Sequence, residues 1–380
     1  MEIKLAFFVM TMVVTAFWMV WRRRLPPSRT YGVIDAIVPA YNEELCLVDA
    51  LKVFLKNPYF NQIIVVNDGS TDRTAEVLDA FAKDNPRIIP VHQENTGKGG
   101  ALMNGLSHAV SPYVFLSDAD TIIPPESDGL GYMLAEMDTG ADAVGGIPAS
   151  NLVGAGLQPY IRATVKLPMI IIERTFQQLI GGAPFIISGA CGLFKAEVLR
   201  AVPFSDRTKV EDLDLTWSLV AKGYKVRQAS RCIVYSQEAN SVKGEWLRWR
   251  RWIIGYAVCM RLHRNLLLTR FGIFTIMSKF LVVFVGIAAY AIYLDPFLSE
   301  SLIGRALHII IPLASLPLVF AFGAISAVHH RKFVLIPLAP TAIFYLAMSY
   351  VIWMTHGLKG LFTGRELERD KPERYACVVE

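Results

Sequence analysis

The sequence predicts an α/β domain with a mostly parallel sheet, joined to transmembrane helices. Two observations lead to this class. Hydrophobic residues make up 53% of the 380 residues and charged residues only 19%, below the roughly 25% charge of a typical soluble domain. The apolar residues are also unevenly distributed, because most of the excess lies in four long runs. Between the first and the second of these runs, strand-like and helix-like segments alternate. The composition argues against an ordinary cytosolic protein and against a disordered one.

Each apolar run is about as long as the roughly 20 residues that cross a bilayer as a helix. None shows the polar stripe of a buried helix in a soluble protein. The runs cover 5–21, 271–294, 306–328 and 333–353. We therefore expect a multi-pass membrane protein, with an amino-terminal anchor over 1–24 and transmembrane helices within 269–356.

The charges around the first run predict its orientation. Arg22, Arg23 and Arg24 follow the apolar stretch, which favours a cytosolic location for the next domain. A cleaved signal peptide is the alternative, but such peptides carry their positive charge before the apolar stretch. The five cysteines form no CxxC pair, as is typical of a reducing compartment.

Residues 30–240 read as one domain. Short β-rich runs over 33–38, 62–66, 87–91 and 113–116 alternate with helical patterns over 43–55, 71–81 and 98–109. This alternation predicts parallel strands covered by helices. In such sheets ligands bind beyond the carboxyl ends of the strands, so the residues there are the first candidates for a site.

Polar residues follow each predicted strand. Pro39-Ala40-Tyr41-Asn42-Glu43-Glu44 follows the first and Asn67-Asp68-Gly69-Ser70-Thr71-Asp72 the second. The second group suits a turn and a helix N-cap, which leaves Asp68 able to accept a hydrogen bond from a base or ribose. Asn95-Thr96-Gly97-Lys98-Gly99-Gly100 follows the third, where a helix start with a lysine suits an anion. That spacing matches neither a Walker loop nor GxGxxG.

Two pairs of aspartates are candidates for the chemistry. Asp118-Ala119-Asp120 follows the fourth strand, where two carboxylates can hold Mg²⁺ or Mn²⁺ that in turn bridges a diphosphate. Asp212 and Asp214 lie in a second pair, at the start of a helix expected to run to about Ala221. Taken alone, this pair is better explained as acids that complement the helix dipole.

Six motifs in order give these residues a context. They are Val38-Pro39-Ala40-Tyr41-Asn42-Glu43, Val66-Asn67-Asp68-Gly69-Ser70-Thr71-Asp72, Asn95-Thr96-Gly97-Lys98-Gly99, Asp118-Ala119-Asp120, Ser188-Gly189-Ala190 and Glu211-Asp212. Over about residues 33–255 the chain resembles glycosyltransferase family 2, and above all its membrane-bound synthases of hyaluronan, chitin oligosaccharides, poly-N-acetylglucosamine and cellulose.

The resemblance implies a GT-A fold, which is Rossmann-like, and an inverting transfer from a nucleotide-activated sugar, most often a UDP-sugar. It implies Asp212 as the general base and Asp118 and Asp120 as metal ligands. Asn67 stands where many relatives carry Asp. The implied nucleotide-sugar contacts are Ala40, Tyr41, Glu43, Asp68, Lys98, Asp118 and Ala119.

Residues 241–268 predict an amphipathic interfacial helix. Trp246, Trp249 and Trp252 fall at helical spacing, with arginines elsewhere around the helix, which suits a membrane surface. Nucleic acid is a poor explanation of these arginines, since the net charge is only +5. The related enzymes carry Gln-x-x-Arg-Trp here. Arg251 and Trp252 match that motif, whereas Arg248 replaces the glutamine, as in ceramide glucosyltransferases. By resemblance, Glu211, Arg248, Arg251 and Trp252 contact the acceptor and the diphosphate.

The predicted function is the β-linked transfer of a sugar, from UDP-N-acetylglucosamine or UDP-glucose, to a growing polysaccharide or oligosaccharide at the plasma membrane. A single transfer to a membrane lipid, such as a polyprenyl phosphate or a ceramide-like lipid, is the alternative within enzymes. A catalytically dead scaffold or a sugar-nucleotide-binding subunit is the alternative outside enzymes, although all four aspartates are retained: Asp68, Asp118, Asp120 and Asp212. Residues 357–380 form a charged tail whose basic residues favour the cytosol. Three crossings after a cytosolic domain would export it, so either one run does not cross or the tail is outside.

Overall fold

The computed structural model describes residues 25–205, 207–278, 280–281 and 302–363, and side chains within 302–315 are not described. The predicted anchor over 1–24 lies outside these residues. So do most of the second apolar run and the tail from residue 364 onward.

Among the described residues, seven strands form one sheet in the order β3-β2-β1-β4-β6-β5-β7. β1 to β4 pair in parallel, β5 pairs in parallel with β7, and β6 is antiparallel to both of its neighbours. The sheet is therefore mixed but mostly parallel, as predicted. The strands are β1 (Ile34–Ala40), β2 (Phe60–Asp68), β3 (Ile88–Gln93), β4 (Tyr113–Leu116), β5 (Ala143–Ser150), β6 (Gly192–Lys195) and β7 (Val226–Ser236).

The sheet is covered on both faces because its strand residues alternate between two cores. In β1, Ala36 and Val38 join one apolar cluster and Ile37 joins the other. The first cluster includes residues of α2 (Leu47–Lys56), α3 (Thr74–Lys83) and α5 (Gly129–Asp138). The second includes residues of α4 (Gly97–Ser107), α7 (Ala196–Ala201), α8 (Glu211–Ala221) and α9 (Val242–Leu262).

Two helices begin three or four residues later than the sequence pattern predicts. The segment before α2 is held as a loop, because the Glu43 amide donates to the Thr74 hydroxyl at 2.8 Å. The segment before α3 is a turn in which Asp72 Oδ1 accepts from the Thr74 amide at 3.0 Å. Side-chain acceptors thus compete with the helix for these backbone amides.

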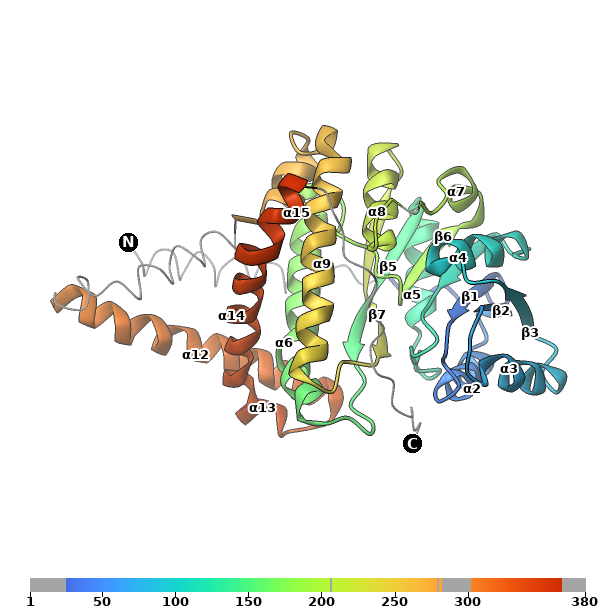
Figure 1. Cartoon of the computed structure of the whole chain (residues 1–380), viewed down its shortest axis with the longest axis horizontal. Coiled ribbons are helices and arrows are strands. Elements are labelled where there is room, and N and C mark those ends of the chain that lie inside the picture. The colour runs from blue at the N-terminus through green and yellow to red at the C-terminus, as the bar shows by residue number, and fades with distance from the viewer. Residues whose placement is uncertain (1–24, 206, 279, 282–301, 364–380) are drawn as a thin grey trace.

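A second group of helices stands beside the sheet (Figure 1). Helices α6, α9 and α14 run upright in that view, and α12 extends away from them to the left. The remaining elements are α6 (Leu157–Phe176), η1 (Gln177–Gly181), η2 (Arg264–Leu266), η3 (Gly272–Met277), α12 (Leu302–His330), α13 (Leu335–Leu338), η4 (Ala339–Ala342), α14 (Ile343–Ile352), η5 (Trp353–Gly357) and α15 (Leu358–Thr363). In the part of the chain that is described, one helical segment, Leu335–Thr363, is long and apolar enough to cross a membrane.

Helix α9 packs into the protein through its aromatic residues. Trp246, Trp249, Trp252 and Tyr256 are partly buried and pack against the apolar cluster that contains α8, while the interfacial location predicted for 241–268 stays a prediction. The arginine at 248 is not a surface cation either, because its guanidinium pairs with Glu238 and Glu245 inside the protein. Tertiary packing, which periodicity does not report, has turned this face of the helix inward.

Candidate active site

The loops that follow β1 and β2 are locked together. The Asn42 amide donates to the Ser70 hydroxyl at 2.9 Å, and Asn42 Oδ1 accepts from the Thr71 amide at 2.7 Å. Asn42 has a φ of 54°, a left-handed conformation that asparagine tolerates better than most residues. The register of β1 and β2 places Ala40 beside Asn67, so the two predicted nucleotide loops begin next to each other at the same edge of the sheet.

The loop after β3 orients Asp68. This side chain is buried, and its Oδ1 accepts from Gln93 Nε2 and from the Thr96 amide, both at 2.8 Å. Gly69 makes the approach of that loop possible: its φ is +67°, and a Cβ there would lie 2.7 Å from the Asn95 backbone nitrogen. Three strand-end loops thus converge around the predicted nucleotide contact.

The remaining predicted nucleotide contacts lie at the same edge of the sheet, with different degrees of burial. Ala40 ends β1 and is buried, while Tyr41 in the next position is exposed. The Glu43 side chain is buried below the loop, and Ala119 is buried between Asp118 and Asp120. Tyr41 is therefore the most exposed of these residues.

Lys98 connects the first aspartate pair to the start of α8. Its Nζ lies 2.6 Å from Asp118 Oδ1 and 3.8 Å from Glu211 Oε1. These three residues come from α4, from the loop after β4 and from α8. The structure thus brings together a predicted nucleotide contact, a predicted metal ligand and a predicted acceptor contact.

Asp212 lies in the first turn of α8 and faces this group. Its Oδ2 accepts from the Gly189 amide at 3.0 Å, and its Oδ1 accepts from the Leu213 amide at 2.9 Å. Burial raises the pKa of Asp212, and the negative charge of Glu211 raises it further, while Lys98 and the two amides oppose the rise. A carboxylate held by two amides and made more basic by its surroundings suits a general base.

Asp214 points to a different environment. His263 Nε2 lies 2.6 Å from its Oδ1, and Arg207 Nε donates to its Oδ2 at 2.9 Å. Although burial alone would raise the pKa of Asp214, the hydrogen bonds from His263, Arg207 and Ser205 hold it well below its usual range. The second aspartate pair therefore differs from the first in function. Asp212 faces the site, whereas Asp214 joins α8 to the end of α9.

Asp118 and Asp120 have the chemistry of a hard-cation site. Both follow β4; Asp120 is buried and Asp118 is partly exposed. In the described part of the chain, no group of three or more His, Cys, Asp or Glu side chains is close enough to hold a metal ion. Two carboxylates leave coordination positions for the oxygens of a diphosphate, which is compatible with Mg²⁺ or Mn²⁺ bound together with a nucleotide.

A buried ionic cluster that the sequence did not predict lies between α6, α9 and the end of β7. Glu238 accepts from Lys166 Nζ at 2.5 Å and from the Ser150 hydroxyl at 2.8 Å, and it also pairs with Arg248. Glu245 pairs with Arg248 and accepts from Trp249 Nε1 at 2.7 Å.

The predicted contact of Arg248 with the acceptor and the diphosphate stays a prediction, and so do the predicted contacts of Arg251 and Trp252. Only the spacing of Glu245 and Arg248 on one helix could have signalled part of this cluster.

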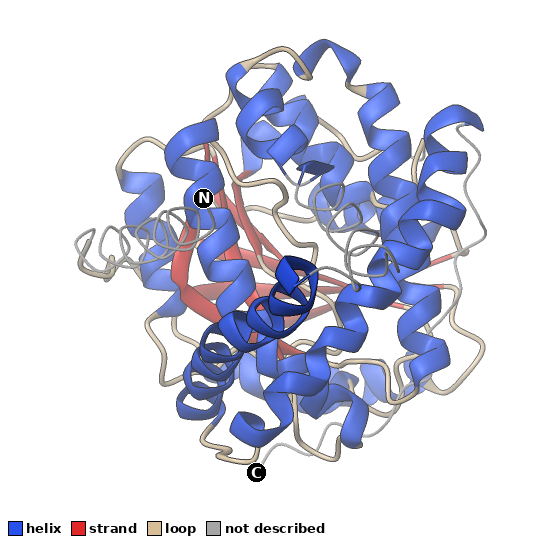
Figure 2. Cartoon of the chain, turned by 90° about the vertical axis from the view of Figure 1, so that its left-hand side faces the viewer, coloured by secondary structure: helices blue, strands red, loops and turns tan. Residues whose placement is uncertain are grey.

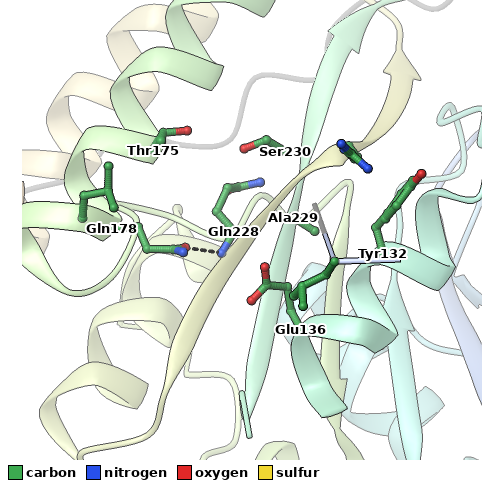
Figure 3. A pocket seen from close by; sticks show the side chains of 10 residues that line it. Tyr132, Glu136, Thr175, Gln178, Gln228, Ala229 and Ser230 are labelled. Atoms are coloured by element: carbon green, nitrogen blue, oxygen red, sulfur yellow. Dashed lines mark hydrogen bonds between the residues drawn. The ribbon is translucent and has the colours of Figure 1, made fainter. Parts of the chain in front are cut away.

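The close-up in Figure 3 shows a pocket between α5, β7 and the end of α6. A hydrogen bond joins Gln228 and Gln178 there: the Gln228 backbone amide donates to Gln178 Oε1 at 2.6 Å. Its lining residues are Leu25, Tyr132, Glu136, Thr175, Gln178, Leu179, Gln228, Ala229, Ser230 and Arg231. None of them is a predicted site residue, so this pocket is separate from the group around Asp212.

Arg174 lies between the two regions and was also missed by the sequence. Its side chain is buried, and Nη1 donates to the Gly146 carbonyl at 3.1 Å and to Gln228 Oε1 at 3.4 Å. Burial lowers the pKa of this guanidinium. The Gly146 amide in turn donates to the Cys191 carbonyl at 2.9 Å, next to the turn that holds Asp212.

Comparison with known proteins shows which family this chain resembles. The model described as glycosyl transferase family 2 matches residues 35–202. An uncharacterized glycosyltransferase of Escherichia coli strain K12, YaiP, is 56% identical over 375 residues, which cover 98% of this chain and 94% of that protein. The poly-beta-1,6-N-acetyl-D-glucosamine synthase of Staphylococcus aureus strain COL is 30% identical over 273 residues, 69% of this chain and 64% of the synthase.

Among solved structures, the mannosyltransferase PcManGT from Pyrobaculum calidifontis, in complex with GDP-Man and Mn²⁺, is similar with a TM-score of 0.54. The two chains are 20% identical, and the match covers 91% of this chain and 96% of that one. This likeness confirms the predicted GT-A-like fold.

Proposed function

The chain belongs to glycosyltransferase family 2 and is a glycosyltransferase, and we propose that it is an inverting membrane enzyme that transfers a sugar from a UDP-sugar to a growing polysaccharide or oligosaccharide. The donor is UDP-N-acetylglucosamine or UDP-glucose, and the new linkage is β. The observation that carries this proposal is the placement of Asp212, which two amides hold beside Lys98, Asp118 and Glu211.

Asp212 acts as the general base. Its carboxylate takes the proton of the acceptor hydroxyl while the hydroxyl oxygen bonds to the anomeric carbon, and the bond from that carbon to the diphosphate oxygen breaks. One displacement inverts the anomeric centre, so no covalent sugar intermediate is needed. The raised pKa of Asp212 suits this role, because a more basic carboxylate accepts the proton more readily.

The donor half of the site holds the nucleotide and the diphosphate. Asp68 contacts the base, with Ala40, Tyr41, Glu43 and Ala119 shaping the surrounding loops. Lys98 is close enough to Asp118 to contribute positive charge where the diphosphate departs. Asp118 and Asp120 would hold Mg²⁺ or Mn²⁺, which neutralises the charge of the leaving diphosphate when bound.

The acceptor half is built from α8 and α9. Glu211 precedes the base in α8 and faces Lys98. Arg251 and Trp252 contact the acceptor and the diphosphate. Arg248, with its two carboxylate partners, also holds α9 against the end of β7.

The enzyme lies in the plasma membrane, which is the inner membrane in a bacterium, with its catalytic domain in the cytosol. This location is supported by the four apolar runs and by the arginines after the first of them. A cytosolic site has direct access to sugar nucleotides, and a site at the bilayer can receive an acceptor that is bound to lipid or held by the membrane.

The test is to incubate membranes containing the enzyme with a panel of labelled sugar nucleotides and to size the products. High-mass labelled material from UDP-N-acetylglucosamine or UDP-glucose supports the proposal. A single labelled species that extracts into organic solvent would instead indicate one transfer to a lipid. Membranes with Asp212→Asn are the negative control. The proposal is wrong if the native enzyme incorporates label from none of the sugar nucleotides.

A further inference from the structure

The apolar segment Leu335–Thr363 runs along α9 instead of leaving the domain. Tyr345 lies near the start of α6, where its hydroxyl donates to the Gln158 carbonyl at 3.2 Å. Farther along, Arg261 Nη1 donates to the Phe362 carbonyl at 2.8 Å. Between these points α14 and α15 stand beside α9 in Figure 1.

Glycines allow the two helices to approach closely. A Cβ at Gly357 would lie 2.9 Å from Ile253 Cγ2, and a Cβ at Gly360 would lie 3.4 Å from the Ala257 Cβ. Residue numbers rise together along both helices, so they run in the same direction over the second half of α9. The position of the apolar segment relative to a bilayer is therefore tied to that of α9.

Helix α9 cannot lie across the hydrocarbon of a bilayer. It carries Lys243, Glu245, Arg248, Arg250 and Arg251 in its amino-terminal half and Arg261 in its last turn, with no charged residue over 252–260. Its amino-terminal half also shares the buried ion pairs with Lys166 of α6 through Glu238. Ionised side chains are costly in the hydrocarbon of a bilayer, and a crossing by α9 would take the charged residues of its amino-terminal half into it.

The exposed face of Leu335–Thr363 is apolar. Phe344 is 73% exposed, Val351 50% and Phe362 78%. From Phe344 through Ala347 and Val351 to Met354 these residues recur every three or four positions, and Phe362 follows eight residues later, about two turns on, which places them on one side of the helix. The opposite side is buried against the protein through Tyr345, Ile352 and Trp353. A helix with one side on protein and one apolar side outward suits the surface zone of a bilayer.

Helix α12 has the opposite character. It leaves the upright helices crosswise in Figure 1 and projects toward the viewer in Figure 2. Its last turns are docked on the protein: the Ser326 hydroxyl donates to the Thr164 carbonyl at 3.2 Å, and a Cβ at Gly323 would lie 2.7 Å from the Ala339 Cβ. A helix that leaves the domain in this direction can cross a bilayer while α9 lies along its surface.

We infer that Leu335–Thr363 does not cross the membrane but lies along its surface, on the same side as the catalytic domain, with Phe344, Val351 and Phe362 in contact with lipid. The inference rests on the proposed membrane location of the enzyme. Basic residues at the edges of the segment, Arg331, Lys332 and Lys359, suit anionic lipid headgroups. The tail then stays on the side of the domain, which satisfies the preference of its basic residues for the cytosol.

Cysteine labelling tests the side of the membrane on which each part lies. Cys377 in the tail is a native reporter, and the described cysteines, Cys46, Cys191, Cys232 and Cys259, are buried. Lys332→Cys reports the turn after α12, and Val110→Cys reports the exposed surface of the catalytic domain. Both are made with Cys377→Ser, and Cys377→Ser alone is the control for background. Carbonate-washed vesicles of known orientation are treated with a membrane-impermeant maleimide before and after permeabilisation.

We expect all three positions to label from the same side. Labelling of Cys377 from the side opposite to Lys332→Cys would mean that Leu335–Thr363 crosses, and would overturn the inference. Loss of the protein in the carbonate wash would also overturn it. The readout does not depend on sugar transfer, so an inactive but inserted enzyme would leave this inference intact and reject only the proposed reaction.

A fluorophore on Val351→Cys, also made with Cys377→Ser, tests the lipid contact. Lipids with a nitroxide near the headgroup should quench it more than lipids with a nitroxide at the end of the acyl chain. The reverse order would place this residue at the centre of the bilayer, and absence of quenching by both would place it away from lipid. Either result contradicts the inference.

Discussion

The Gly189 amide donates a hydrogen bond of 3.0 Å to Asp212 Oδ2. Because a Cβ at Gly189 would lie 2.7 Å from Lys98 Nζ, the same glycine leaves room for the ammonium that neutralises this corner of the site. The turn at Ser188-Gly189-Ala190 therefore orients the proposed base and admits its neighbouring cation.

Replacing Asp212 with asparagine should abolish transfer while leaving the binding of the UDP-sugar and membrane insertion largely intact. Removal of a general base costs about 10²- to 10⁴-fold in rate. Turnover with a labelled donor and equilibrium binding of the nucleotide sugar are the two measurements. Asp214→Asn is the matched control, since it lies in the same turn but should lower stability more than turnover per folded molecule. Unchanged turnover in Asp212→Asn would reject the assignment of the base.

The rate should depend on pH through Asp212. Its raised pKa places the acidic limb of kcat/KM above the pH at which an ordinary aspartate titrates, about 3.9. In Glu211→Gln the loss of a negative charge lowers the pKa of Asp212, so the limb should move to lower pH. Lys98→Met removes a positive charge and should move it to higher pH. Shifts of both variants in the same direction would contradict this account.

Removal of divalent metal should stop the reaction. Asp118 and Asp120 provide two carboxylates, and the leaving diphosphate needs positive charge to depart. Dialysis against a chelator followed by an assay of transfer should show loss of activity, with recovery on addition of Mg²⁺ or Mn²⁺. Full activity of the chelated enzyme would reject the role given to this pair.

Gly69→Ala should weaken donor binding. The left-handed φ of this residue is strained for alanine, and the added methyl would collide with the backbone at Asn95, which helps to orient Asp68. We expect a higher KM for the UDP-sugar and a destabilisation of about 1 kcal/mol or more. Gly140→Ala, at another positive φ where the added Cβ would meet only Lys225 Nζ, at 3.9 Å, separates backbone strain from the collision. Equal effects of the two variants on KM would argue against a role for the Gly69 turn in donor binding.

Asp214 should contribute to stability above acidic pH. Its pKa is lowered in the folded protein, so its contribution is present above the unfolded value of about 3.9 and is lost as pH falls below it. His263→Ala removes one partner and should destabilise the protein by about 1–3 kcal/mol near neutral pH, seen as a lower Tm. The difference in Tm between this variant and the native protein should shrink toward pH 3, and a difference that grew there would contradict the sign of the shift.

The nucleotide half of the fold was predictable to within a few residues. β4 and α8 have the predicted bounds or nearly so, because their apolar spacing is regular. α2 and α3 start late, because loop side chains capture the amides before them. The motifs around Asp68 and Asp118 lie at one edge of the sheet because the parallel strands β2 and β4 end there, whereas Asp212 comes from the first turn of α8, where the Gly189 amide holds it.

Other features depended on contacts between distant residues. Arg248 stays a predicted contact of the acceptor and the diphosphate, and its pairing with Glu238 was not predictable, because the two residues are ten positions apart and only the fold brings them together. Arg174 and Lys166 carried no signal, since a single charge in a helix reads as a solvated residue until its burial is known. The inequality of Asp212 and Asp214 was equally hidden, because it arises from the Gly189 amide on one side and His263 on the other.

The sequence by itself determined the family, the order of the site motifs and the apolar character of the segment Leu335–Thr363. Whether that segment lies across or along a membrane was open, because hydropathy counts the residues of a helix and says nothing of its neighbours. The tertiary structure decided what it packs against. Leu335–Thr363 runs beside α9, whose charges cannot enter the hydrocarbon, and the energy of a helix in a bilayer depends on its partners as much as on its own side chains.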